Sequence, residues 1–165
     1  MVKNRHFRHD VELGRLITNL HSLELVLRDF LLTDTEGLNK SRRHARSLKK
    51  MRIGQYVAEN PFTNYDSLKR LIDKYNKRVE TGAKGYAVDE KIVKLRDAIA
   101  HGRTFAYGPD MPMLLMKFSR PKEGMVKVEF SAVMTIDWFD KQIKWVKREL
   151  DKAIEAYKLL SEGKL

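Results

Sequence analysis

Most hydrophobic positions of this 165-residue chain recur at alternating intervals of three and four residues, the period of an amphipathic α-helix. The longest such seam runs from Leu13 to Phe30, and a matching one runs from Phe139 to Leu160 near the C-terminus. Two shorter stripes lie between them, from Leu68 to Val79 and from Val88 to Ile99. The spacing predicts a helix over each of these stretches.

The first half of the chain is expected to contain one further helix, with a loop before it and another after it. The pattern fails from Thr33 to Asn39, which is expected to form a loop. The run from Lys40 to Arg52 leads into a second helix that is expected to end before Asn60-Pro61, because the residue before a proline disfavours helical geometry. Thr63-x-x-Asp66 has the spacing of a capping box and predicts the start of the next helix.

The second half carries a different period. Met113 to Phe118 is a short apolar run, and apolar residues alternate with polar ones from Val126 to Ala132, as in a half-buried strand. Pro121 and Gly124 lie between the two runs, which predicts a β-hairpin near 113–133. Thr135 is the expected cap of the last helix. The predicted fold is all-α, a helical bundle of about five helices with one inserted hairpin, forming a single domain over 1–165.

Composition narrows the classes of function. The chain has no cysteine, which excludes a disulfide framework, a thiol nucleophile and a cysteine zinc site, and a cytoplasmic setting is expected. No uncharged apolar run is long enough for a signal peptide or a membrane span, so no membrane partner is expected. The net charge of +11 favours a polyanionic partner, with nucleic acid preferred to a membrane surface.

The positive charge is concentrated in one segment. Seven lysines and arginines and no acid occur between Lys40 and Arg52. One interpretation is a solvated face without a function. The other is a surface that contacts RNA phosphates without reading sequence, with five of these cations as its candidates: Arg42, Arg43, Arg46, Lys49 and Lys50.

Most catalytic templates are absent from the sequence. There is no P-loop, no G-x-S-x-G elbow and no H-E-x-x-H, and the five histidines form no ligand set, so neither a metal nor a cofactor is expected. Three ionisable residues remain near the end of one predicted helix. Asp97 lies one turn before His101 on nearly the same side, and Arg96 lies about 140° from His101 around the axis. Gly102 follows, in the place where a glycine often ends a helix in the left-handed conformation.

Arg96-Asp97-Ala98-Ile99-Ala100-His101 resembles the signature of the HEPN superfamily, an arginine followed by a polar residue and, after four to six intervening residues, a histidine. The resemblance implies a compact helical bundle, and many members are metal-independent ribonucleases. In an endoribonuclease of this kind His101 would act as base or acid, Arg96 would hold phosphate oxygens, and Asp97 would orient the imidazole. HEPN-like dimers bring two motifs together, so the resemblance also implies a composite site at a homodimer interface.

The face of the same predicted helix that carries Val93 and Ala100 suits such a dimer seam. Arg103, expected among the RNA-binding cations, stands where members paired with nucleotidyltransferase antitoxins often carry a tyrosine. This departure argues against that particular pairing, while a toxin-like or defence role with another antitoxin or regulatory partner stays open.

Two other interpretations of the motif remain. A HEPN-like domain can bind RNA or a protein without cleaving, and a histidine at a helix end is stabilised by the helix dipole without any function. The loose pattern also occurs a second time, from Arg15 to His21, within the leucine-rich helix. There Leu16 occupies the polar position, and His21 is expected to be a packed, hydrogen-bonded residue.

Overall fold

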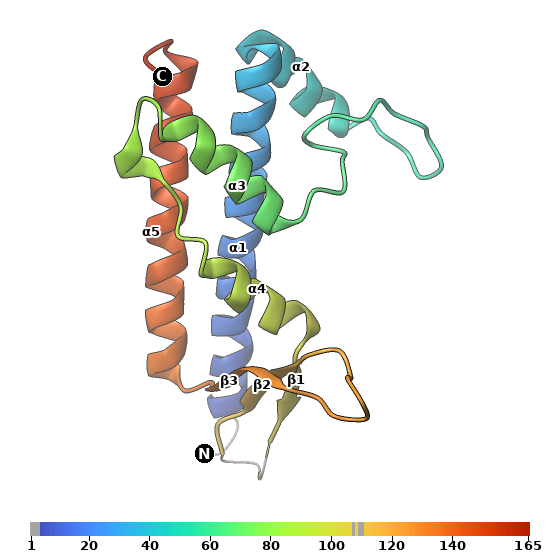
Figure 1. The fold of residues 1–165 in the computed structure, drawn as a ribbon, viewed down its shortest axis with the longest axis vertical. Helices are drawn as coiled ribbons and strands as arrows, with labels where there is room; N and C mark the ends of the chain where they lie inside the picture. Colours follow the sequence, from blue (N-terminus) through green and yellow to red (C-terminus); the bar gives the residue numbers. More distant parts are fainter. Residues whose placement is uncertain (1–3, 107, 109–110) are drawn as a thin grey trace. The chain divides into compact units, whose positions relative to one another are not determined.

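The computed structural model describes residues 4–106, 108 and 111–165. The chain packs into two compact units, which we name the sheet unit (residues 1–20 and 91–147) and the helical unit (21–90 and 148–165). The expected single domain stays a prediction, and each unit is described by itself. Five α-helices and three strands occur in the described residues (Figure 1). They are α1 (Asn4–Glu36), α2 (Leu38–Leu48), α3 (Leu68–Val79), α4 (Ile92–His101), β1 (Arg103–Phe105), β2 (Leu114–Phe118), β3 (Val128–Val133) and α5 (Ile136–Ser161).

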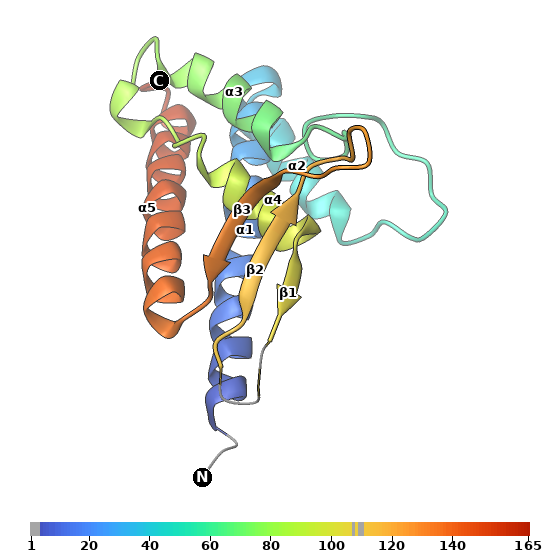
Figure 2. The same cartoon turned by 60° about the horizontal axis from the view of Figure 1, so that its bottom comes forward.

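The predicted mostly helical fold with one hairpin is confirmed at this level. In the sheet unit, β2 and β3 pair antiparallel over the predicted hairpin, and Leu115 lies opposite Ala132. β1 adds a third strand to the other side of β2, with Arg103 opposite Met116 (Figure 2). The hydrophobic pattern did not predict β1, because a strand of three exposed residues carries no period.

The core of the sheet unit comes from helices and from the central strand. α4 packs against β2. The buried apolar residues of this unit are Leu16, Leu20, Ile92, Leu95, Ala98, Leu115, Met134, Phe139 and Val146. The predicted alternation in the second strand holds only in part, because Phe130 and Ala132 are half-buried whereas Val126 and Val128 are about half exposed. The apolar face of β3 is therefore less buried near the hairpin turn than at the end that leads to α5.

Gly102 ends α4 as predicted, but in a different conformation. Its φ of −76° and ψ of 176° are extended rather than left-handed. Its N–H donates to the Ala98 carbonyl at 2.8 Å. A β-carbon at this position would lie inside van der Waals contact with that same oxygen, 2.9 Å from Leu115 Cδ1 and 3.0 Å from the Met116 carbonyl oxygen. Glycine is therefore required here by the close approach of α4 to β2, not by a positive φ.

The helical unit is held together by α1, α3 and α5. Phe30 and Tyr75 are fully buried, and their rings meet edge to face with centroids 4.8 Å apart. Leu23, Leu27 and Ile72 are also completely buried, as the helical stripes predict. Their burial confirms the predicted apolar faces of α1 and α3.

Three predicted helix boundaries are wrong. The loop expected from Thr33 to Asn39 is reduced to Gly37, with φ of 82°, because α1 continues to Glu36 and α2 begins at Leu38. The expected extension of α2 toward Asn60 is absent, since this helix ends at Leu48. The cap of α3 is Ser67, whose Oγ accepts the Arg70 N–H, rather than Thr63.

The last predicted cap is correct: Thr135 Oγ1 accepts the Trp138 N–H at 3.1 Å, at the start of α5. None of the helices described is both long enough and apolar enough to cross a membrane.

Candidate functional site

The three residues of the motif lie on the last two turns of α4. Arg96 and Asp97 are each about one-third exposed, and the Arg96 Nη1 atom lies 3.2 Å from Asp97 Oδ1. His101 is the last residue of the helix and is exposed. The structure therefore presents all three side chains to solvent, at least in part.

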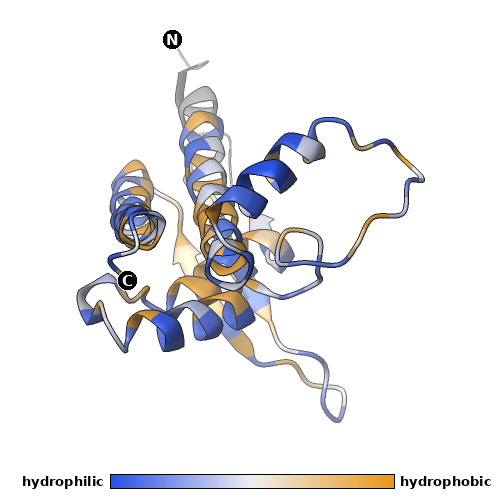
Figure 3. Cartoon of the chain, turned by 90° about the horizontal axis from the view of Figure 1, so that it is seen from above, coloured by the Kyte–Doolittle hydropathy of each residue, from blue (hydrophilic) through white to orange (hydrophobic). Residues whose placement is uncertain are grey.

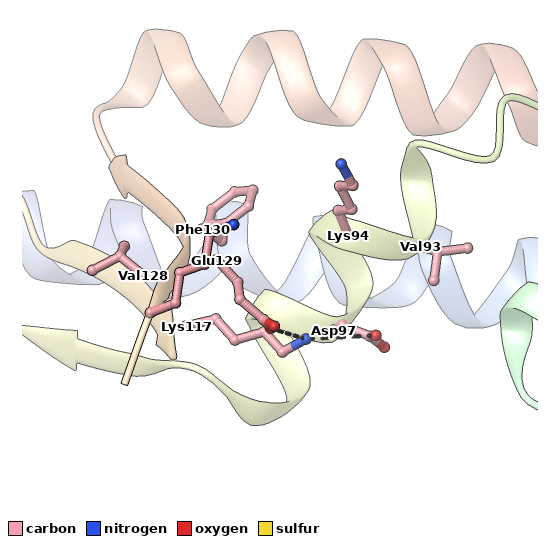
Figure 4. A pocket seen from close by; sticks show the side chains of 8 residues that line it. Val93, Lys94, Asp97, Lys117, Val128, Glu129 and Phe130 are labelled. Carbon is pink, nitrogen blue, oxygen red and sulfur yellow. Dashed lines mark ion pairs between the residues drawn. The ribbon is translucent and has the colours of Figure 1, made fainter. Parts of the chain in front are cut away.

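Asp97 belongs to a chain of charges that joins α4 to the sheet. Lys117 of β2 lies between two acids, with its Nζ 3.8 Å from Asp97 Oδ2 and 3.1 Å from Glu129 Oε2 (Figure 4). A register shift between Lys117 and Phe118 makes Glu129 the extra residue of β3, opposite no partner of β2. Such a bulge redirects a side chain, which here brings Glu129 toward the lysine. These charges border a groove of 370 Å³ whose apolar wall includes Val93 and Phe130.

The expected contact between Asp97 and His101 is not made. Among the described residues, no hydrogen bond or ion pair joins the two side chains, whereas both Arg96 and Lys117 bind the carboxylate. The role of Asp97 as an orienting group for the imidazole therefore has no support in this geometry. Its two cations make it a link between α4 and β2.

His101 lines a second pocket, which has a volume of 240 Å³. Arg103, which follows on β1, lines the same pocket, and its guanidinium carbon lies 5.8 Å from the centroid of the Phe118 ring. Ser119 completes one side, where its N–H donates to the Lys127 carbonyl and its Oγ accepts the Lys127 N–H. The pocket thus combines an imidazole, a guanidinium and an aromatic face on a short stretch of fixed backbone.

Arg96 lies apart from this pocket. It lines neither of the two pockets described above, and helix geometry separates it from His101 by about 140° and about 7.5 Å along the axis. The cation that shares a pocket with His101 within one chain is Arg103. From its sequence position Arg103 was expected only to contact phosphate, because the strand that places it beside His101 was not predicted.

The predicted RNA-binding cations lie on the helical unit. Arg42, Arg43 and Arg46 of α2 and the two lysines that follow, Lys49 and Lys50, are all exposed, and we name these five residues the basic surface. No ion pair among the described residues engages any of them. Hydrophilic residues dominate α2 (Figure 3), and Ser41 is its buried residue. The apolar residues of α2 are only Leu38, Ala45 and Leu48, and its cations are free to contact phosphates.

The second match to the motif, from Arg15 to His21, lies on α1. His21 is exposed on α1, so its expected packing is wrong, and Arg15 binds Glu12 at 3.2 Å. Within the described part of the chain, no group of three or more histidines and acids is placed to hold a metal ion.

Comparison of the chain with protein-family models, with curated proteins and with solved structures gave no match. The functional argument therefore rests on the sequence motif and on the geometry of the site.

Proposed function

We propose that this chain is a metal-independent endoribonuclease of the HEPN type, with His101 as its central catalytic residue. The observation that carries the proposal is the pocket in which His101 lies beside Arg103 and Phe118. An imidazole that can move a proton, a guanidinium with bidentate donors and an aromatic face are together groups that suit a nucleotide and its phosphate.

The reaction needs three functions. A base removes the proton from the ribose 2′-hydroxyl, whose oxygen then attacks the adjacent phosphorus. The bond from phosphorus to the 5′-oxygen breaks, an acid protonates that oxygen, and the products carry a 2′,3′-cyclic phosphate and a 5′-hydroxyl. A cation stabilises the charge on the phosphorane. His101 supplies the base or the acid, and Arg103 supplies the cation in the same chain.

One histidine cannot serve as base and acid in the same step, so we propose that two copies of the chain form the complete site. Ala100 is exposed next to His101, which suits a seam that brings two imidazoles together. In such a homodimer Arg96 of one copy, which lies about 140° from its own histidine, would reach the phosphate held by the other copy. The basic surface would contribute sequence-independent contacts with phosphates.

The test is cleavage of single-stranded RNA in excess EDTA, with the product ends identified. We expect 2′,3′-cyclic phosphate or 3′-phosphate ends and 5′-hydroxyl ends. His101→Ala should lower the rate by at least about 100-fold, the lower range for loss of general acid–base catalysis. His21→Ala is the matched control, because it removes an equally exposed helical histidine from the second occurrence of the motif.

Equal rates for the wild type and His101→Ala would remove the catalytic claim and leave an RNA-binding module. Ala100→Glu tests the dimer: we expect it to reduce both the dimer fraction in sedimentation at micromolar concentration and the cleavage rate. A monomer that cleaves RNA at the full rate would refute the composite site.

A further inference from the structure

The loop that connects α2 to α3 carries two tyrosines that are fully exposed. Tyr65 is 104% exposed and Tyr56 is 100% exposed relative to a reference residue. A folded protein ordinarily covers part of such large rings. Their complete exposure calls for an explanation other than packing.

The backbone on both sides of Tyr65 is fixed by one buried arginine. The Arg28 side chain is 13% exposed, and it lies against Glu24 on α1 at 2.9 Å. Its Nη1 donates to the Pro61 carbonyl at 2.8 Å and to Asn64 Oδ1 at 2.9 Å, and its Nη2 donates to the Asp66 carbonyl at 2.9 Å. The guanidinium therefore anchors the residues that immediately precede and follow Tyr65.

A second set of bonds makes a tight turn at the tyrosine. Asn64 Oδ1 also accepts the Asp66 N–H at 3.1 Å, which closes an Asx turn with Tyr65 at its centre. Because the turn is held from inside by Arg28, the ring of Tyr65 is presented outward from a fixed backbone. Because this backbone is already fixed, stacking on the ring costs no ordering of the loop around Tyr65.

Two cations bind the acid that follows Tyr65 in the sequence. The Asp66 carboxylate next to Tyr65 is neutralised by Lys74 Nζ at 2.6 Å and by Arg70 Nε at 3.2 Å, and Arg70 is 70% exposed. The hydrogen bond from Lys74, followed by the charges of both cations, lowers the pKa of Asp66 below its ordinary value. The same loop begins at the basic surface, where Lys49 and Lys50 follow α2.

We propose that this part of the helical unit is a binding site for single-stranded RNA, in which Tyr65 and Tyr56 stack on unpaired bases while the basic surface contacts the phosphates. The proposal deepens the proposed function and rests on it for the identity of the ligand. Aromatic rings together with cations suit a single strand, because every base has a stacking face and every nucleotide carries one phosphate. A duplex offers no free base face to the two rings.

A membrane surface is the other class of partner that exposed apolar residues beside cations could fit. Binding in the lipid interface requires a helix with an apolar face. The exposed large apolar residues of the loop, Ile53, Tyr56, Val57 and Tyr65, lie outside any helix, and α2 carries only three apolar residues among its eleven, Leu38, Ala45 and Leu48. RNA is therefore the ligand that the surface favours.

The experiment measures binding of a labelled twelve-nucleotide oligouridine by fluorescence anisotropy, in EDTA and in the His101→Ala background so that the strand stays intact. We expect Tyr65→Ala to raise the Kd by about 10-fold, from the typical contribution of one stacked base, and Tyr65→Phe to leave it nearly unchanged. Ile53→Ala is the matched control, because Ile53 is on the same loop and equally exposed but has no aromatic ring. A duplex of the same length should show no dependence on Tyr65.

Charge reversal tests the phosphate contacts independently. Replacing Arg42, Arg43 and Arg46 with glutamate should lower the slope of log Kd against log salt by at least about 2, because each phosphate that a cation neutralises on a single strand adds about 0.7 to that slope. Because all these side chains are exposed, the urea midpoint of each variant should match that of its parent.

Three outcomes would overturn the site: no binding of the oligonucleotide, the same Kd for Tyr65→Ala as for the parent, or an equal loss with Ile53→Ala. Vesicles of phosphatidylcholine and phosphatidylserine form the comparison arm, and loss of vesicle binding in Tyr65→Ala with unchanged RNA binding would assign the surface to lipid and overturn the proposal. Failure here is distinct from failure of the proposed nuclease. If cleavage depends on His101 and RNA binding does not depend on Tyr65, only the proposed binding site is refuted. If RNA binding depends on Tyr65 and the protein does not cleave RNA, only the proposed nuclease activity is refuted.

Discussion

Replacing Gly102 with alanine tests how closely α4 approaches β2, at the residue between His101 and Arg103. The φ of −76° is allowed for alanine, so the substitution introduces no backbone strain of its own. The added β-carbon would instead collide with the Ala98 carbonyl oxygen, with Leu115 Cδ1 at 2.9 Å and with the Met116 carbonyl oxygen at 3.0 Å. Two of these three atoms belong to the backbone and cannot rotate away.

The cost follows from what has to move. Overpacking a fixed site costs about 1–3 kcal/mol, and contacts with two backbone oxygens place Gly102→Ala near the upper end, at about 3 kcal/mol. With a urea m-value of about 2 kcal/mol per molar, the unfolding midpoint should fall by about 1.5 M. The separation of α4 from β2 should also displace His101 and Arg103, so cleavage should fall together with stability.

Gly14→Ala is the matched control. Gly14 lies within α1, and a β-carbon there would meet nothing within 4 Å. Removing a glycine from a helix interior stabilises by about 0.5–1 kcal/mol, so the same substitution should raise the midpoint. Trp138 and Trp145 lie in the sheet unit with both glycines, and their fluorescence in a urea titration reports the transition. An unchanged midpoint for Gly102→Ala would refute the close approach.

Two further predictions concern the helical unit. Tyr75 is fully buried and its hydroxyl donates to the Tyr86 carbonyl at 3.0 Å, so Tyr75→Phe should cost about 1 kcal/mol at pH 7. Burial, and next the charge of Glu149, raise the pKa of Tyr75. The stability that the neutral hydroxyl contributes is therefore complete below the unfolded pKa near 10 and is lost as the pH rises above it. The urea midpoints of wild type and Tyr75→Phe should differ at pH 7 and converge at pH 10.5, and a constant difference would contradict this. Glu149 is fully buried, accepts the Asp89 N–H at 3.0 Å and binds Lys152 at 2.9 Å. Glu149→Ala should lower the free energy of unfolding by about 3 kcal/mol, measured by thermal or urea unfolding. Glu149→Gln should cost less, because glutamine keeps an acceptor for the Asp89 amide.

The sequence predicted the helices well because their burial follows the period of the helix itself. Leu16, Leu23 and Leu27 recur at heptad-like spacing and are all completely buried. Helix ends were harder to predict because local polar residues decide them. At the start of α3, for example, Ser67 rather than Thr63 caps the helix, because its Oγ accepts the Arg70 N–H.

The site was predicted only along one helix. Arg96, Asp97 and His101 lie on α4 as the spacing indicates, because positions on a helix follow from sequence separation alone. Their partners come from strands that are distant in sequence: Lys117 reaches Asp97 from β2, and Phe118 lies under Arg103. Such pairings depend on strand register, which the hydrophobic pattern near residue 103 was too short to specify.

The charges around α4 explain why an acid follows Arg96 even without a role in catalysis. Asp97 binds Lys117 of β2, and Lys117 also binds Glu129 at the bulge of β3, so one lysine connects the helix with two strands. Asp97 is engaged from the sheet side, and His101 has no carboxylate partner among the described residues; the charged side chain that lines a pocket with it is that of Arg103. In the proposed nuclease one histidine cannot be base and acid in the same step, so the two copies of His101 in the dimer would divide the transfer of a proton from the 2′-hydroxyl and the transfer of a proton to the 5′-oxygen.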